Sequence, residues 1–363
     1  MLEVSVSKNG LDPDWDNFLE TRPDGCYQQS SLWAKLKSAG GWKPLRLVVK
    51  ENGAVIGGAQ MLLRPVKSLG CVGYVSKGPV VASNDAAVQD YVLDQLDRVA
   101  KAQNVRFLKV QPPYGQEDVA ERLLERRAIP SEAEVVSPAT ARVDIRPEPE
   151  AILARMSRGR RKAVRRAERD GVTVREGTDA DMPTFHRLLR IHSEERGYHP
   201  YPESYHRNLY STFLTGGHAC LLIAEYEGEA LAAMIILRFG DVVFGMFIVD
   251  SGLHMELSAQ SLLRWKTILW GKEKGCAWYD FGGISMPIAE AVLKGERIPD
   301  TTREGRLARS KMSFGSQVLL RPAACDISYV WPRRLTGRIV PAVMKMQPLV
   351  RSLLGGSIHG DYA

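Results

Sequence analysis

The sequence predicts a mixed α/β protein made of two tandem units that share one plan. The chain has 363 residues, and at roughly 150 residues per domain this is enough for two hydrophobic cores. Its composition, 44% hydrophobic and 25% charged, is typical of a globular protein. The second observation is an internal repeat in which a hairpin, a helix and a strand follow one another twice.

The first copy of the repeat begins with a predicted hairpin at residues 46–63, turned by Asn52-Gly53. A helical pattern follows at residues 86–103, with its apolar side chains on one face, and it leads into a strand at residues 107–110. These three elements form one α/β unit.

The second copy begins with a predicted hairpin at residues 221–237, turned by Glu227-Gly228. A helical pattern at residues 258–274 leads into a strand at residues 278–281. The copies are offset by about 170 residues, and the repetition of all three elements in one order favours a tandem repeat over a chance likeness of two hairpins.

The boundary between the units is predicted near the proline-rich stretch 146–149, which gives a first domain of residues 1–147 and a second of residues 148–317. Beyond them, arginine and lysine alternate with apolar residues from Trp331 to Leu354, with breaks at Pro341 and Pro348. This pattern predicts a basic amphipathic helix pair. It would either pack on the first domain or lie on an anionic membrane surface, such as the inner membrane surface.

Positive charge is concentrated in one predicted helix. The net charge of +7 favours a polyanionic partner. Arg158, Arg161, Arg165 and Arg169 follow at steps of three or four and therefore share one helix face, which Gly171 ends. Guanidinium groups bind phosphate oxygens in pairs, so this row is predicted to bind a tRNA acceptor stem or a pyrophosphate. The alternative is a solvated surface.

Several kinds of chemistry are not indicated. The five cysteines are scattered, which argues against a disulfide framework or a zinc site and favours free thiols in a reducing cytoplasm. The N-terminus does not resemble a signal peptide, and no apolar run reaches the ~20 residues of a membrane span. No nucleotide-binding glycine motif is present, and the spaced histidines are interrupted by Pro200 and Pro202, so we expect no metal and no cofactor.

Six motifs occur in order along the chain. They are Q-Q-S-S-L-W-A-K-L-K at residues 28–37, S-K-G-P-V at 76–80, R-D-G-V at 169–172, A-E-Y-E-G at 224–228, W-Y-D-F-G-G-I at 278–284 and S-K-M-S-F-G at 310–315. Together they resemble the Fem family of peptidyltransferases, which build peptidoglycan interpeptide bridges from aminoacyl-tRNA. The resemblance covers residues 15–330 approximately and is specific to the family, not to a substrate.

The resemblance implies two domains of the N-acetyltransferase-like (GNAT) fold, with the chain end, from about residue 318 to 363, returning to the first domain. It implies an aminoacyltransferase that takes an aminoacyl group from aminoacyl-tRNA and forms an amide bond on a peptidoglycan precursor or related peptide. In this reading the first domain binds the acceptor and the second the donor. The sequence has no room for the coiled-coil arm of the longer members.

The resemblance also implies roles for individual residues. Lys37, with Lys35 beside it, matches a lysine that binds acceptor phosphates, and Lys77 lies on a second motif of that acceptor site. Lys311 matches the lysine that supports the acyl-transfer transition state, although Ser310 replaces the usual aromatic residue. Asp280 is a candidate proton acceptor, but a structural partnership with a backbone turn is favoured.

Two positions depart from the family pattern. Gln111 stands where short members can carry an aspartate proposed as a base, and an amide cannot accept that proton. Tyr201 stands where a phosphate-binding arginine is expected. Both changes leave the acceptor open: it is a peptidoglycan precursor, either lipid-linked or nucleotide-linked, or a soluble peptide.

Two other functions compete with this interpretation. An acyl-CoA-dependent N-acyltransferase of the same fold would need a Q/R-x-x-G-x-G/A pyrophosphate loop between a strand and a helix, and the sequence has none in that context. A non-catalytic protein that binds tRNA or a membrane is the third reading.

Overall fold

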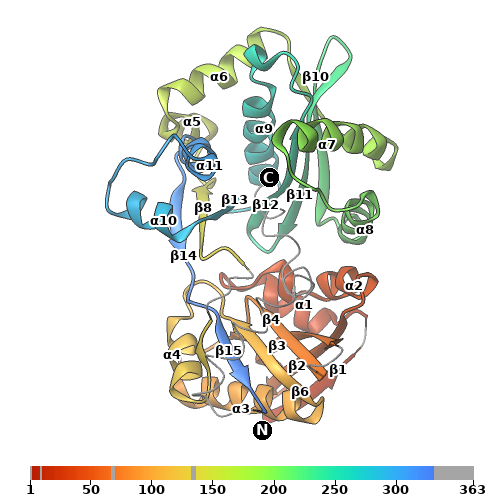
Figure 1. Cartoon of the computed structure of the whole chain (residues 1–363), viewed down its shortest axis with the longest axis vertical. Coiled ribbons are helices and arrows are strands. Elements are labelled where there is room, and N and C mark those ends of the chain that lie inside the picture. The colour runs from red at the N-terminus through yellow and green to blue at the C-terminus, as the bar shows by residue number, and fades with distance from the viewer. Residues whose placement is uncertain (1, 9, 67–69, 132–135, 331–363) are drawn as a thin grey trace. The chain divides into compact units, whose positions relative to one another are not determined.

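The structure, a computed structural model, describes residues 2–8, 10–66, 70–131 and 136–330. The amphipathic segment expected from Trp331 to Leu354 lies outside these residues. Within them the chain forms two compact units (Figure 1). Unit one comprises the residues up to Pro138 and those from Leu320 to Val330, and unit two comprises Ala139–Leu319.

Unit one contains the first copy of the predicted repeat. The expected hairpin is present, and Asn52 and Gly53 both have positive φ, at 50° and 83°, as a tight hairpin turn requires. The elements of the unit are β1 (Leu2–Ser7), α1 (Pro13–Glu20), α2 (Ser31–Ala39), β2 (Lys43–Glu51), β3 (Ala54–Val66), β4 (Gly70–Ser76), β5 (Val80–Val81), α3 (Ala86–Ala102), β6 (Val105–Gln111), α4 (Glu117–Glu125), β7 (Ile129–Pro130) and β15 (Cys325–Ser328).

Unit two contains the second copy. Glu227 and Gly228 again have positive φ, at 49° and 82°, in the turn of the expected hairpin. The elements of the unit are β8 (Ala139–Asp144), α5 (Pro149–Arg155), α6 (Arg158–Arg169), β9 (Thr173–Glu176), α7 (Met182–Arg196), α8 (Glu203–Leu214), β10 (Ala219–Tyr226), β11 (Glu229–Phe239), β12 (Val242–Asp250), α9 (Ala259–Glu273), β13 (Trp278–Ile284), α10 (Met286–Leu293), α11 (Arg303–Met312) and β14 (Gln317–Leu320).

The two sheets have the same strand order. Unit one reads β1-β2-β3-β4-β6-β15-β7, and unit two reads β9-β10-β11-β12-β13-β8-β14. In each sheet the parallel pair follows the helix of the repeat: β4 pairs with β6 after α3, and β12 pairs with β13 after α9. A right-handed helical crossover is the usual link between such parallel strands. The predicted fold class, two tandem α/β units, is confirmed.

Each sheet is completed by a strand from a distant part of the chain. In unit one, β15 lies between β6 and β7, although the chain reaches it only after passing through unit two. In unit two, β8 lies between β13 and β14, although it precedes every other element of the unit. The strands that follow β7 and β14 are therefore exchanged between the units. The sequence-based boundary at residues 147–148 falls after β8, which groups with unit two because it pairs with β13.

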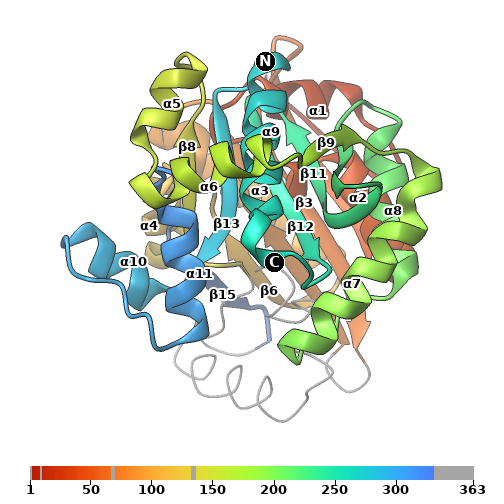
Figure 2. The ribbon, with the colours of Figure 1, turned by 90° about the horizontal axis from the view of Figure 1, so that it is seen from above.

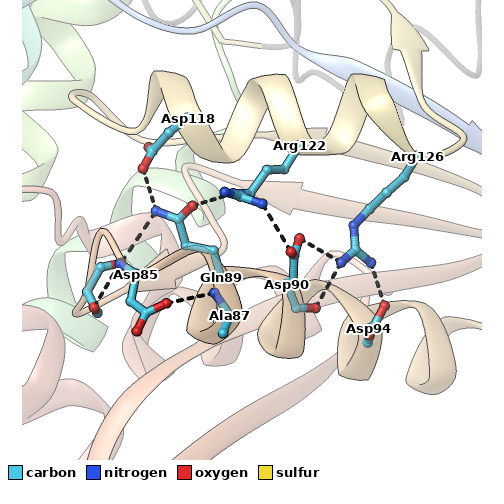
Figure 3. A network of polar contacts seen from close by, with 9 residues as sticks. Asp85, Ala87, Gln89, Asp90, Asp94, Asp118, Arg122 and Arg126 are labelled. Atoms are coloured by element: carbon cyan, nitrogen blue, oxygen red, sulfur yellow. Dashed lines mark hydrogen bonds and ion pairs between the residues drawn. The ribbon is translucent and has the colours of Figure 1, made fainter.

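Helices α3 and α4 cover the core of unit one and are tied together by charged side chains at their surface (Figure 3). Arg122 pairs with Asp90 at 3.0 Å, and Arg126 pairs with both Asp90 and Asp94, at 2.9 and 2.5 Å. Beneath this network Val92 and Leu96 of α3 pack on the sheet. The charged pairs are half-exposed and therefore add less stability than the apolar core.

The core of unit two is built around α9. Leu262, Trp265 and Ile268 are buried, as the helical pattern predicted, and pack with residues of β10 to β13. Helix α6 packs against α9 (Figures 1 and 2) through Val164 and Ala167. The basic helix is therefore attached to the core by one apolar stripe.

A buried ion pair fastens the exchanged strand of unit one. Lys109 of β6 lies opposite Asp326 of β15, and their charged atoms are 2.6 Å apart with both side chains buried. We expect Asp326→Asn to lower the free energy of unfolding by about 3–5 kcal/mol, because the lysine charge stays buried without its carboxylate counter-charge.

The exposed pair on the neighbouring helices provides the control for this prediction. Asp94→Asn should lower the free energy of unfolding by less than about 1 kcal/mol, because Arg126 remains paired with Asp90 and these side chains are solvated. Both variants are compared with the unaltered protein by urea denaturation. Equal losses for the two variants would contradict the special role of the buried pair.

Candidate functional site

The first candidate residue, Asp280, is a structural centre of unit two. Its carboxylate is buried on β13 and pairs with Arg142 of β8 at 2.9 Å. It also accepts hydrogen bonds from the Thr140 hydroxyl and from the Gly282 backbone N–H, the latter at 2.8 Å. Because its oxygens are engaged by these donors, the arrangement suits the structural role better than that of a proton acceptor.

The Asp280 contacts sit at an irregularity of β13. The pairing register with β8 shifts between Asp280 and Gly283, and Gly282 has a φ of 84°, which favours glycine. The neighbouring Gly283 carbonyl accepts a hydrogen bond from the Lys311 ammonium at 2.7 Å. The bulge and the candidate catalytic lysine are therefore in direct contact.

Lys311 belongs to the last turn of α11 and is 4% exposed. Its motif continues into a tight turn, in which Phe314 packs on Phe281 with ring centroids 5.0 Å apart and Gly315 has a φ of 78°. A side chain at Gly315 would meet the Arg155 carbonyl at 2.7 Å. The motif thus packs between β13 and the end of α5, which fixes the position of the lysine.

The predicted arginine row lies on α6 as expected. Arg158 and Arg165 are exposed. Arg161 bonds to the carbonyls of Ala154 and Met156, and Arg169 pairs with Asp170 at 2.9 Å. Among the described residues no carboxylate pairs with Arg158 or Arg165, so both present charge to solvent.

The sequence analysis missed Arg160, which lies on the same helix but faces inward. Its guanidinium donates to Ser313 at 2.9 Å and Ser310 at 3.2 Å, and also to Ser261 of α9. It lies 4.5 Å from the centre of the Phe314 ring. Burial, together with the charge of Arg264, lowers the pKa of Arg160 to about 10.

A signal for Arg160 was present in the sequence. Arg160, Val164 and Ala167 are spaced by four and three residues and so lie on one face of the helix. An arginine on the apolar stripe of a helix must find buried polar partners. The serines of the S-K-M-S-F-G motif supply them.

The acceptor-side motifs of unit one also come together. Gln29 is fully buried, and its amide donates to the Ser76 carbonyl at 2.6 Å and accepts from the Gln60 backbone N–H at 2.7 Å. Its side chain fills the space at Gly78, where a Cβ would approach it to 2.7 Å. The Q-Q-S-S and S-K-G-P motifs therefore form one packed assembly.

Lys37 and Lys77 flank an aromatic pair in this assembly. The Lys37 ammonium lies 4.5 Å from the Trp33 ring centre, and the Lys77 ammonium lies 5.5 Å from that of Tyr27. The two rings meet edge to face at 5.2 Å. Lys77 is also buried and 3.5 Å from the Cys26 sulfur. The structure thus brings both lysines to one aromatic surface, whereas Lys35 is exposed.

Gln111 ends β6 beside this assembly. It is 2% exposed, its amide donates to the Val136 carbonyl at 3.4 Å, and its own carbonyl accepts from the Gly78 N–H at 3.0 Å. A neutral amide at this position binds backbone groups and cannot take a proton from an amine.

Tyr201 of unit two belongs to an aromatic cluster. It stacks on Tyr205 with ring centroids 4.3 Å apart and meets Phe247 edge to face. His206 lies in the same cluster, 4.7 Å from Phe247. Where the family pattern expects a cation, this chain therefore presents stacked rings.

The loop between β12 and α9 occupies the place of the pyrophosphate loop named above. It reads S-G-L-H-M-E-L-S over residues 251–258, with Gly252 as its one glycine and Glu256 as a negative charge. Asp250 at its start is held by His192 and Arg196, both at 3.1 Å. This loop does not match the Q/R-x-x-G-x-G/A pattern.

In the described part of the chain, no group of three or more histidine, cysteine or acidic side chains is placed to hold a metal. The five cysteines are free thiols. Across the described residues, no helix is long and apolar enough to cross a membrane.

Two family models match the chain in order. The FemAB family model matches residues 12–127, and the acetyltransferase (GNAT) domain model matches residues 154–289. Together with the repeated sheet, these matches define a tandem GNAT-fold protein. The resemblance to the Fem family that the six motifs predicted is confirmed by the FemAB match and by the relatives described next.

Curated relatives support this assignment. Lipid II:glycine glycyltransferase of Staphylococcus aureus is 26% identical over 231 residues, which are 61% of this chain and 55% of the relative. The same protein from strain USA300 gives the same values. The match therefore spans about half the length of these relatives.

Solved structures share the fold. The crystal structure of FemX superposes with a TM-score of 0.82 at 19% identity and covers 93% of this chain and 99% of its own. A tandem GNAT protein from the clavulanic acid biosynthesis pathway has a TM-score of 0.52 at 13% identity, covering 90% and 98%. The C-terminal domain of a putative lysylphosphatidylglycerol synthetase from Agrobacterium fabrum has a TM-score of 0.55 at 12% identity, covering 91% and 93%.

The buried histidine of the aromatic cluster makes stability depend on pH. Burial, assisted by His186, lowers the pKa of His206 from 6.5 to about 4. Between these values the unfolded chain binds a proton that the folded protein does not. Stability from this group is therefore complete above pH 6.5 and decreases as pH falls toward 4, by at most about 3 kcal/mol.

We expect His206→Phe, which suits the aromatic surroundings, to flatten the fall in melting temperature between pH 7 and pH 4.5. His199 is exposed and serves as the matched control, so His199→Phe should leave the pH dependence unchanged. Thermal unfolding across this pH range measures both. Equal pH slopes for the His206 variant and the unaltered protein would rule out this titration.

Proposed function

We propose that this protein is an aminoacyltransferase that moves an aminoacyl group from aminoacyl-tRNA to an amine of a peptidoglycan precursor or related peptide. The observation that carries the proposal is Lys311, a buried ammonium held against the Gly283 carbonyl at the β13 bulge. The match to the FemAB family model supports it, as do the relatives, which carry the name lipid II:glycine glycyltransferase.

The reaction needs little covalent chemistry from the protein. An aminoacyl ester is already activated, so the acceptor amine attacks its carbonyl carbon directly. The new C–N bond forms first and gives a tetrahedral intermediate. This intermediate collapses as the ester C–O bond breaks, and the amine proton ends on the released ribose oxygen. Lys311 stabilises the oxyanion of the tetrahedral intermediate, an interaction worth on the order of 3 kcal/mol. Positioning of the two substrates supplies much of the remaining rate enhancement.

The general base is not assigned to Asp280. Its carboxylate oxygens accept from Arg142, Thr140 and Gly282, which leaves this group to shape the bulge that supports Lys311. Gln111 has no basic oxygen. The attacking amine is therefore proposed to lose its proton to the leaving oxygen or to water.

We assign the acceptor to unit one and the donor to unit two, the units that correspond to the domains expected at residues 1–147 and 148–317. Lys37 and Lys77 at the Trp33–Tyr27 surface suit acceptor phosphates, with Lys35 as a further contact. Tyr201 would contact substrate by stacking. The aminoacyl-tRNA is proposed to bind along Arg158, Arg161, Arg165 and Arg169.

The proposed setting is the cytoplasm, where charged tRNA is available, with a peripheral contact to the inner membrane surface when the acceptor is lipid-linked. An acyl-CoA donor is disfavoured, because the loop at residues 251–258 offers one glycine and carries Glu256.

The function is tested by mass spectrometry of reactions that contain charged tRNA, acetyl-CoA or neither, with extracted cell-wall precursors as acceptors. We expect a product heavier by one aminoacyl residue with charged tRNA alone. Lys311→Met should lower kcat by about 10²–10³, because it removes the oxyanion partner.

The exposed lysine Lys294 provides the matched control, and Lys294→Met should leave the rate unchanged. Acylation from acetyl-CoA instead of tRNA would refute the proposed donor. A Lys311 variant with full activity would refute the proposed mechanism.

Removal of charge at Lys37 should act on acceptor binding. We expect Lys37→Met to raise the acceptor KM about tenfold or more with little change in kcat, because a ground-state phosphate contact is lost. Lys37→Arg should recover part of the affinity, and Lys43→Met, at an exposed lysine, should have no effect. Steady-state kinetics with varied acceptor measure these values. A collapsed kcat at unchanged KM would argue against the phosphate contact.

A further inference from the structure

Unit two contains two guanidinium groups close to one another, one half-buried and one buried. Arg160 extends inward from α6, and Arg264, on the second turn of α9, is 8% exposed. Each packs on an aromatic face: Arg160 lies 4.5 Å from the Phe314 ring centre and Arg264 lies 5.4 Å from that of Phe281. Since these two rings are themselves in contact, the cations share one small region of the core.

The partners of both cations are neutral. Arg160 donates to the hydroxyls of Ser261, Ser310 and Ser313. Across the described residues, no carboxylate lies within ion-pair distance of Arg160 or Arg264. By contrast, Arg142, which is as buried as Arg264 in the same unit, is paired with Asp280. Two adjacent cations that are partly or fully shielded from solvent and lack a counter-charge repel one another, and a bound anion would offset that cost.

The site has further features that favour an anion. An arginine has more N–H donors than the three serine contacts of Arg160 use. Ser261 and Arg264 belong to the first two turns of α9, a helix of 15 residues whose N-terminal end carries positive potential. Ser310 and Ser313 bracket Lys311 in the sequence, so an anion here would lie beside the proposed catalytic motif.

We propose that Arg160, Arg264 and the first turns of α9 form a binding site for one phosphate group of the acyl donor. Guanidinium forks match the paired oxygens of a phosphate, which is the chemistry the site offers. The inference rests on the proposed function, in which the phosphate is a phosphodiester at the 3′ end of the aminoacyl-tRNA. The pyrophosphate of CoA has the same chemistry and is separated from it by the test.

This site is distinct in role from the exposed row of α6. Arg158 and Arg165 face solvent and would contact the RNA stem whatever its end carries. Arg160 and Arg264 would contact only the RNA strand that enters the unit with the acyl group. The affinity for the RNA therefore has two parts: the exposed arginines bind the stem, and Arg160 and Arg264 bind the end that carries the acyl group.

The test compares two uncharged RNA minihelices, one ending in single-stranded CCA and one trimmed to the stem. We expect the unaltered protein to bind the CCA form at least about tenfold more tightly. Arg160→Gln and Arg264→Gln should reduce this ratio to about one. Arg165→Gln, on the same helix, should weaken both RNAs alike and keep the ratio. If Arg264→Gln does not fold, Arg264→Lys takes its place. Lysine retains the positive charge but cannot bind two phosphate oxygens in parallel, so this variant should keep part of the ratio.

Retention of the full ratio in both the Arg160 and the Arg264 variants would overturn the site. If the unaltered protein binds neither RNA, the tRNA donor is overturned. The phosphate site is then tested by measuring the melting temperature with CoA and with inorganic pyrophosphate. A rise in melting temperature that the unaltered protein shows and both Gln variants lose would support a phosphate site for another donor. No rise in the unaltered protein would overturn the site as well.

Discussion

The exchange of one strand between the two sheets is the constraint on which the candidate site depends. Strand β8 follows the strands of unit one in the sequence but completes the sheet of unit two, where it lies between β13 and β14. It carries Thr140 and Arg142, the two side chains that hold the Asp280 carboxylate. Strand β15 makes the reciprocal connection and carries Asp326 to Lys109. In both sheets an ion pair between directly opposed residues fixes the register of the exchanged strand.

The geometry around Lys311 follows from this register. Because β8 holds Asp280, the carboxylate can accept a hydrogen bond from the Gly282 N–H, which stabilises the bulge. The bulge in turn places the Gly283 carbonyl where Lys311 donates a hydrogen bond to it. Phe281, on the opposite side of the strand, supports Phe314 of the lysine's own motif. A residue that resembles a catalytic base in the sequence therefore acts on the site through the backbone.

The repeat was predictable because its signals are local. Asn52-Gly53 and Glu227-Gly228 determine their turns by their own conformational preferences, and helical periodicity marks α3 and α9. The exchanged strands could not be recognised in the same way, because β8 and β15 are short and their partners are distant in the sequence. The six motifs did predict the resemblance to the Fem family, and they proposed Lys37, Lys77 and Lys311 as site residues. What they could not give was the aromatic pair that joins Lys37 to Lys77, which arises only when α2 and β4 pack together.

The basic helix shows why charge alone is an incomplete guide to a binding surface. Selecting its arginines by charge and helical spacing identifies the solvent-facing row and leaves out Arg160, whose neighbours on the wheel are Val164 and Ala167. Exposed guanidiniums are screened by salt and contribute little individually. A guanidinium held by serines against Phe314 is less screened and more rigid, so it interacts more strongly with an anion that reaches it. If α6 binds RNA as proposed, its selectivity for one end of the ligand would reside in its apolar stripe, whereas its charged face would supply the general attraction.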